Sequence, residues 1–234
     1  MAEKNTSNYH TLFLKHIGYH AWFMVPVCLF WLVGLSLKLV FQHGEEVMWL
    51  NDWRIEPFNS TFRFFSTWGE WPPYVLLGLP FLLWRYRIVL VIAIAGLITI
   101  PSVILLKRTF QQPRPHTYFE QTGTRERLIT VPGTPLVSGP SSFPSGHATA
   151  AFTIFTLLTL GIYETHAWSR IGTLFALAAI LAAFARVFLA QHFLSDILAG
   201  SVAGLLLGNF FWWIGLYFKR FPALERGLMR EERR

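Results

Sequence analysis

The chain has 234 residues, of which 53% are hydrophobic and 14% charged, and its mean hydropathy is +0.41. This composition excludes an ordinary soluble domain and indicates a membrane protein. The formal net charge of +7 does not indicate a nucleic-acid partner, because the basic residues gather at the ends of apolar runs rather than on a solvated face with interleaved aromatic residues.

Six apolar runs are long enough, or nearly so, to cross a bilayer. They cover residues 20–41, 72–84, 88–106, 147–163, 170–190 and 197–218, and the second is the shortest. The runs predict an all-α fold, a polytopic membrane helix bundle of about six transmembrane helices. The stretch before the first run is polar and does not look like a secretory signal, so we expect the first helix to be retained.

Three regions follow from this pattern. Residues 1–70 form an N-terminal region with the first transmembrane helix and an interfacial segment, because aromatic residues alternate with charges over 44–70. Residues 71–218 form the core helix bundle. Residues 219–234 form a basic cytoplasmic tail, whose final stretch LERGLMREERR is expected to be a solvated helix end.

An even number of spans places both termini on one side of the membrane, and that side carries most of the basic residues, which predicts that it is cytoplasmic. These residues are Lys4, Lys15, Arg85, Arg87, Arg170, Lys219, Arg220, Arg226, Arg230, Arg233 and Arg234. The opposite, outward side receives 42–70 and a long polar loop over 116–143.

The first cluster of polar residues lies where the third run ends, in the stretch LLKRTFQQPRPH. Lys107 and Arg114 are separated by six residues, and Pro113 and Pro115 enforce an extended backbone, so the two cations can converge on one point. Taken alone, they are also compatible with interfacial anchors. The neighbouring Arg108 is expected to face solvent or a lipid headgroup.

The second cluster, SSFPSGHATAAF, precedes the fourth run. Ser145 and Gly146 lead into the helix and His147 falls in its first turn, where free backbone N–H groups and the helix dipole favour an anion. The alternative is a turn with Ser145 as the helix cap.

The third cluster, ARVFLAQHFLSDILAG, joins the fifth and sixth runs. Asp196 is close enough in sequence to accept a proton from one ring nitrogen of His192, which leaves the other nitrogen free. Arg186 supplies a third cation. The alternative is that Asp196 only favours the helix dipole and pairs with Arg186. Because all three clusters fall on the outward side, together they predict a site for a phosphate ester.

These clusters resemble the three motifs of the type-2 phosphatidic acid phosphatase (PAP2) family, K-x6-R-P, P-S-G-H and S-R-x5-H-x3-D. They stand here as Lys107 to Pro115, Pro144 to His147, and Arg186 to Asp196, with every spacing matched. One position departs from the pattern, since Ala185 replaces the usual serine. The resemblance implies an integral membrane lipid phosphatase without cofactor or metal, which works through a phosphohistidine.

The roles expected from this resemblance divide the residues into two groups. The catalytic residues are His192 as nucleophile, Asp196 as its partner and His147 as general acid and base. The phosphate-binding residues are Lys107, Arg114, Ser145, Gly146 and Arg186. The other histidines are expected to take no part: His10, His16, His20, His43, His116 and His166.

The expected activity is that of a metal-independent phosphoric monoester or diphosphate hydrolase, in a bacterial inner membrane with the site on the periplasmic face. Its candidate substrates are undecaprenyl pyrophosphate, phosphatidylglycerophosphate, phosphatidate and a lipid A phosphate. Arg125 and Arg127 in the loop favour the diphosphate slightly. The alternatives are a lipid phosphotransferase and a non-enzymatic lipid transporter.

Overall fold

The computed structural model describes residues 2–166 and 170–229, with side chains described for 20–165 and 170–229. All regular structure in these residues is helical, which confirms the predicted all-α fold. The α-helices are α1 (Ala2–Val40), α2 (Glu45–Trp49), α3 (Phe58–Ser66), α4 (Trp71–Gly78), α5 (Tyr86–Phe110), α6 (Pro115–Gln121), α7 (Gly146–His166), α8 (Ile171–Phe188) and α9 (Leu194–Tyr217). The 3-10 helices are η1 (Leu50–Trp53), η2 (Thr67–Gly69), η3 (Leu79–Leu83), η4 (Arg125–Arg127) and η5 (Phe218–Arg220).

Five helical segments of the described chain, rather than the expected six, are long and apolar enough to cross a bilayer. They are His20–Val40, Tyr86–Gln121, Gly146–Thr165, Ile171–Phe188 and Leu194–Arg220. The expected second span is a shorter apolar helix, Trp71–Leu83, made of α4 and η3. At about 1.5 Å per residue it extends about 20 Å, less than the roughly 30 Å of a bilayer core.

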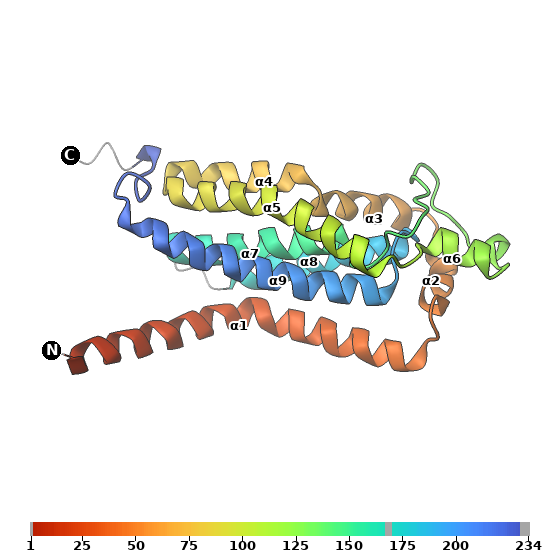
Figure 1. Cartoon of the computed structure of the whole chain (residues 1–234), viewed down its shortest axis with the longest axis horizontal. Coiled ribbons are helices and arrows are strands. Elements are labelled where there is room, and N and C mark those ends of the chain that lie inside the picture. The colour runs from red at the N-terminus through yellow and green to blue at the C-terminus, as the bar shows by residue number, and fades with distance from the viewer. Residues whose placement is uncertain (1, 167–169, 230–234) are drawn as a thin grey trace.

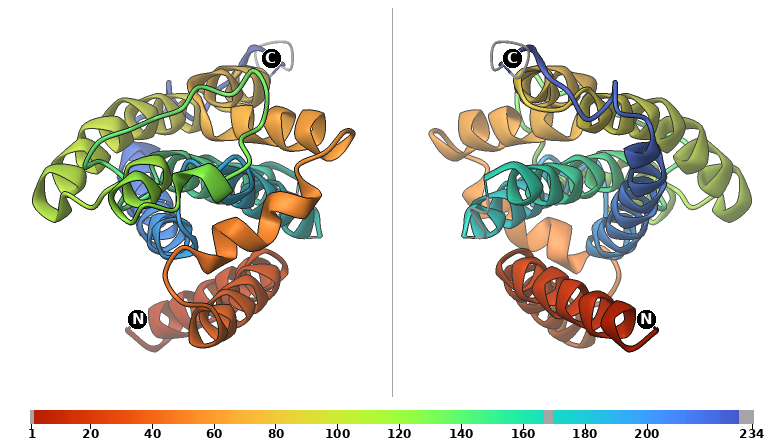
Figure 2. Two further views of the ribbon diagram at one scale, coloured as in Figure 1. Left: turned by 90° about the vertical axis from the view of Figure 1, so that its right-hand side faces the viewer. Right: turned by 90° about the vertical axis from the view of Figure 1, so that its left-hand side faces the viewer.

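The short helix nevertheless reverses the chain as a full span does (Figure 1). The beginning of α1 and the end of α9 therefore lie at the same end of the bundle. The opposite end is covered by α2, α6 and the loop that leads to α7 (Figure 2). The expected outward loop thus contains the short helix α6. Pro115 lies in the first turn of this helix, where the N–H that proline lacks would have no acceptor within the helix.

A row of glycines brings α9 into close contact with α7, the most deeply buried of the spans. Gly200, Gly204 and Gly208 follow one another every four residues, on one face of α9. A Cβ atom at Gly204 would lie 2.4 Å from the carbonyl oxygen of Thr149. The hydroxyl of Thr153 in turn donates to the carbonyl of Gly204 at 3.2 Å. Small residues at this spacing are typical of membrane helices that pack by backbone contact.

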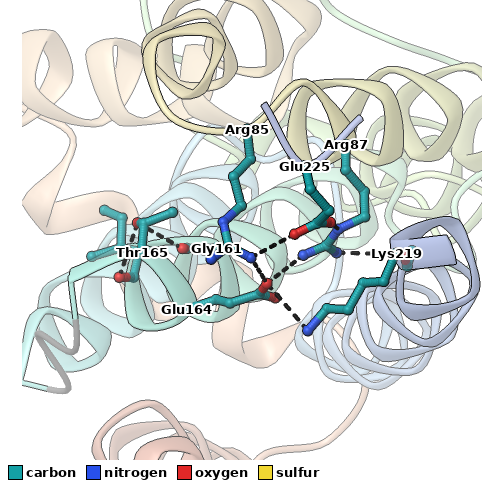
Figure 3. A network of polar contacts seen from close by, with 9 residues as sticks. Arg85, Arg87, Gly161, Glu164, Thr165, Lys219 and Glu225 are labelled. Atoms are coloured by element: carbon teal, nitrogen blue, oxygen red, sulfur yellow. Dashed lines mark hydrogen bonds and ion pairs between the residues drawn. The ribbon is translucent and has the colours of Figure 1, made fainter. Parts of the chain in front are cut away.

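A charged network closes the end of the bundle where α5 begins (Figure 3). Arg85 and Arg87 both pair with Glu164 of α7 and with Glu225, the Arg85–Glu225 distance being 2.8 Å. Lys219 lies 3.2 Å from the same Glu164. These groups are less than half exposed, so the pairs compensate charges that are partly removed from water.

The tail is not the solvated helix end that was expected. Beyond η5 the chain turns back, and the N–H groups of Tyr86 and Arg87 donate to the carbonyls of Arg226 and Leu224 at 2.9 and 2.8 Å. These N–H groups begin α5 and have no acceptor within the helix, which is why the returning segment binds there. Residues 230–234 of the expected tail lie outside the described residues.

The contact between α7 and α9 predicts a loss of stability in Gly204→Ala. The added methyl group has to displace the backbone of α7, and overpacking of this kind costs about 1–3 kcal/mol. We expect a lower thermal midpoint in detergent, measured by the fraction that stays monodisperse after heating. Leu206→Ala, on the exposed face of α9, serves as control and should change stability little. Equal midpoints for the two variants would contradict the packing argument.

Candidate active site

The three sequence clusters meet in one cavity of about 980 Å³, which continues from them along α4 and α5. The helix ends that carry the clusters lie at the end of the bundle that also carries α2 and α6 (Figure 1). The predicted site residues that line it are Lys107, Arg114, Gly146, His147, Arg186 and His192. They come from the end of α5 and the segment after it, the beginning of α7, the end of α8 and the connection to α9. Both imidazoles and all three predicted cations therefore border the same space.

His192 is held in place by the carboxylate behind it. Its Nδ1 atom lies 3.2 Å from Oδ2 of Asp196, in the first turn of α9. The same oxygen accepts hydrogen bonds from Ser142 Oγ at 2.5 Å and from the N–H of Phe193 at 3.0 Å. Asp196 is fully buried and does not line the cavity. With Nδ1–H directed at Asp196, the ring nitrogen left for a substrate is Nε2.

The imidazole of His192 is neutral at physiological pH. The residue is 1% exposed, and this burial lowers the pKa of its imidazole to about 3. Asp196 raises the pKa, whereas the charges of Arg114 and Arg186 lower it further. A neutral imidazole has a free lone pair, so His192 can act as a nucleophile without first losing a proton.

Three cations border the cavity without an acidic partner among the described side chains. Lys107 Nζ donates to the carbonyl of Ser141 at 2.6 Å, and Arg114 Nη1 donates to the carbonyl of Gln191 at 3.2 Å. The Nε atom of Arg186 is buried and has no hydrogen-bond partner. Buried cations of this kind are costly unless an anion pairs with them, so the charges at this cavity favour an anionic ligand.

The beginning of α7 contributes backbone groups. Ser145 caps the helix through its Oγ, which accepts from the N–H of Ala148 at 3.4 Å, and its own N–H donates to the carbonyl of Asp196 at 3.0 Å. Ser145 is buried and does not line the cavity, whereas Gly146 does. An anion at this end of α7 therefore meets the amides of Gly146 and His147 rather than that of Ser145.

Two residues that border the site were not expected from the sequence. Ser66 accepts a hydrogen bond from Arg186 Nη1 at 2.6 Å, and Glu70 Oε1 lies 3.5 Å from His147 Nε2. The hydrogen bond to His147 lowers the pKa of the Glu70 carboxyl below its usual value. Both residues lie in the aromatic N-terminal region, and the three motifs contain no signal for them because the contacts cross long stretches of chain.

Other residues lie away from the cavity. Arg108 is exposed, and neither it nor the loop residues Arg125 and Arg127 line the cavity, which receives only Val137 from this loop. Arg125 instead donates to the carbonyl of Leu128 at 3.2 Å. The loop arginines thus give no support to the preference for a diphosphate that the sequence suggested.

The fold and the cavity define a polytopic helical membrane protein with a cluster of cations and imidazoles at one end of the bundle. The model of the PAP2 superfamily matches residues 84–220, more than half of the chain. The chain belongs to this superfamily, which confirms the resemblance of the three motifs. It is a membrane phosphatase of this superfamily.

Two solved structures resemble the chain. The crystal structure of LpxE from Aquifex aeolicus is 27% identical with a TM-score of 0.60, and the match covers 74% of this chain and 96% of that one. The crystal structure of the transmembrane PAP2 type phosphatidylglycerolphosphate phosphatase from Bacillus subtilis is 19% identical with a TM-score of 0.54. That match covers 86% of this chain and 99% of the other. The second likeness shows the fold alone. No curated protein sequence matches the chain at a significant level.

The depressed pKa of His192 predicts a stability that falls in acid. The unfolded chain binds a proton at this histidine below about pH 6.5, whereas the folded protein does so only near pH 3, so acidification from pH 7.5 to 5 favours unfolding. We expect the thermal midpoint of the wild type to fall more over this range than that of His192→Gln. A fall of the same size in both would show that this histidine does not contribute.

Proposed function

We propose that the protein hydrolyses the phosphoryl group of a membrane lipid monophosphate through a phosphohistidine at His192. The observation that carries the proposal is the shape of the cavity, because one continuous space joins the cations and imidazoles to an apolar groove. The lipid would place its phosphate among Lys107, Arg114 and Arg186 and its chain in the groove.

The groove runs between the short α4–η3 helix and α5. Its lining continues from Glu70 past Tyr74 and Gly78 to Leu79 on one side, which corresponds to about 13 Å along a helix. On the other side it includes Leu97, which is 77% exposed. Exposed apolar residues on its walls mean that the groove is open sideways, at the level where hydrocarbon surrounds the bundle.

A monophosphate fits the charges better than a diphosphate. Three cations can neutralise one phosphoryl group in its transition state, whereas the inner phosphate of a diphosphate needs further donors. The loop residues Arg125 and Arg127, which could have supplied them, do not line the cavity. Phosphatidate, phosphatidylglycerophosphate and a lipid A phosphate are therefore preferred to undecaprenyl pyrophosphate.

In the first step, Nε2 of His192 attacks phosphorus as the bond to the leaving oxygen breaks. His147 gives a proton to that oxygen, which an alkoxide leaving group requires. Asp196 stabilises the positive charge that develops on the ring of His192, since its Oδ2 lies 3.2 Å from Nδ1. The products of this step are the lipid alcohol and the phosphohistidine.

In the second step, His147 is neutral and takes a proton from a water molecule that attacks the phosphohistidine. The bond between phosphorus and Nε2 breaks, and phosphate leaves. In both steps Lys107, Arg114 and Arg186 stabilise the equatorial oxygens, where most of the catalysis of phosphoryl transfer arises. Water as the acceptor makes the enzyme a hydrolase, and a lipid alcohol in its place makes it a phosphotransferase.

The donor set suits a mechanism without a divalent metal. Glu70 is the acidic side chain that lines the cavity among the described residues, and three cations line it as well. A magnesium ion prefers several carboxylate or phosphate oxygens and is repelled by fixed positive charge. We further propose that the site faces the periplasm of a bacterial inner membrane, since the other end of the bundle carries Arg85, Arg87 and Lys219.

A panel of lipid phosphates with EDTA present tests the substrate class. We expect the purified protein to release phosphate from at least one lipid monophosphate at ten times or more its rate with undecaprenyl pyrophosphate. Release should continue with EDTA and without an added acceptor. A higher rate with undecaprenyl pyrophosphate would contradict the proposed preference for a monophosphate, and loss of activity in EDTA would contradict the metal-free mechanism.

Rapid quenching in alkali tests the nucleophile, because phosphohistidine survives base and is lost in acid. With a lipid carrying labelled phosphate, the wild type should retain label on the protein, and His192→Gln should retain none and show no turnover. Arg186→Ala should lower turnover by about 10- to 1000-fold. Arg108→Ala, the matched exposed cation, should behave as the wild type. Label on the His192→Gln protein would remove the assignment.

A further inference from the structure

Glu70 stands at the junction of η2 and α4, with its carboxylate directed at the proposed general acid. Its Oε1 atom lies 3.5 Å from Nε2 of His147, and both residues line the cavity. The backbone of Glu70 is extended, at φ −101° and ψ −177°, and it forms the N-cap of α4. This residue precedes the part of the chain that the family model matches, residues 84–220.

The backbone beside Glu70 is fixed against α7. A Cβ atom at Gly69 would lie 2.6 Å from the carbonyl oxygen of His147 and 2.8 Å from its Cβ, so only glycine allows this approach. Four residues before Glu70, Ser66 is bound to Arg186 at 2.6 Å. The segment from Ser66 to Glu70 thus touches the site on two sides and cannot shift relative to His147 without breaking these contacts.

The charges around His147 require an acidic partner. A general acid has to carry a proton before it gives one, and the cations of Lys107 and Arg186 oppose a positive charge on its ring. Glu70 is the carboxylate that lines the cavity within the described chain, since Asp196 is buried behind His192. Its negative charge offsets the cations at the ring where the proton is needed.

We propose that Glu70 is a positioning residue for His147, holding the ring through Nε2–H and stabilising its protonated form. The proposal rests on the role of His147 in the proposed function. As the bond between phosphorus and the leaving oxygen breaks, the proton on the other ring nitrogen passes to that oxygen. His147 is then neutral and accepts the proton of the attacking water, while Glu70 remains a carboxylate throughout.

The leaving group separates this role from a purely structural one. An alkoxide needs a proton as it leaves, whereas 4-nitrophenolate is stable without one, so a defect in acid catalysis shows only with the first. We compare kcat/KM, which reports the phosphorylation step, for phosphatidate and 4-nitrophenyl phosphate. Glu70→Gln should lose about 10- to 100-fold with phosphatidate and less than about threefold with the aryl ester.

Two further readouts accompany the comparison. In Glu70→Gln the basic limb of the kcat/KM profile for phosphatidate should move to lower pH, because the protonated ring has lost its counter-charge. Glu70→Asp should recover part of the activity. Glu56→Gln, an exposed acid in the same N-terminal region that does not line the cavity, is the matched control and should resemble the wild type with both substrates.

The variant His147→Asn separates the proposed role of Glu70 from the proposed general-acid role of His147. In His147→Asn, kcat/KM should fall much more with phosphatidate than with 4-nitrophenyl phosphate. In the double variant that also carries Glu70→Gln, kcat/KM with phosphatidate should lie less than about twofold below that of His147→Asn alone. A selective loss in His147→Asn with none in Glu70→Gln would overturn the role of Glu70 and leave the proposed function intact. An equal loss on both substrates in His147→Asn would overturn the general-acid role itself. An equal loss on both in Glu70→Gln would mean that this residue only supports the fold.

Discussion

The site depends on a backbone contact between the beginnings of α7 and α9. The N–H of Ser145 donates to the carbonyl of Asp196 at 3.0 Å, and the glycines of α9 allow the two helices to approach closely enough for it. This contact fixes the start of α7, which carries His147, relative to the residues that orient His192. The cations then border a space between helices that are held by direct backbone contact, an arrangement suited to electrostatic stabilisation without reorganisation.

The N-terminal region contributes more to this end of the bundle than its aromatic composition suggests. Glu46 is buried and accepts a hydrogen bond from the N–H of Leu194, the first residue of α9, at 3.2 Å. Arg54 is also buried and donates to the carbonyl of Phe188, the last residue of α8, at 2.7 Å. These side chains complete the termini of the two helices between which His192 lies. The N-terminal region therefore also supports the helix ends on either side of His192.

The sequence was sufficient for the parts of the site that depend on local spacing. His192 and Asp196 are four residues apart, so the start of one helix places them together, and Lys107 and Arg114 follow from a proline-interrupted helix end. Ser66 and Arg186 could not be paired in this way, because 120 residues separate them and a serine among aromatic residues carries no signal.

The expected second span differs from the other five in its length. The apolar run at 72–84 has the composition of a transmembrane helix but forms two short helices, and Pro80 lies where α4 gives way to the 3-10 helix η3, because proline has no N–H to continue the α-helical bonding. The assignment of the tail to solvent has another cause. Its contact with the first amides of α5 is made by backbone groups, which leave no pattern in the side chains.

A groove that opens sideways has a consequence for how the two products part. In the proposed reaction the lipid alcohol can return to the leaflet through the groove without crossing a polar layer, whereas inorganic phosphate is released among Lys107, Arg114 and Arg186, at the end of the bundle that the outward loop covers (Figure 2). Each product of the proposed reaction can thus leave into the phase in which it is most soluble. The short α4–η3 helix forms one wall of this opening, so in the proposed reaction its shortness gives the lipid product a direct path into the hydrocarbon of the bilayer.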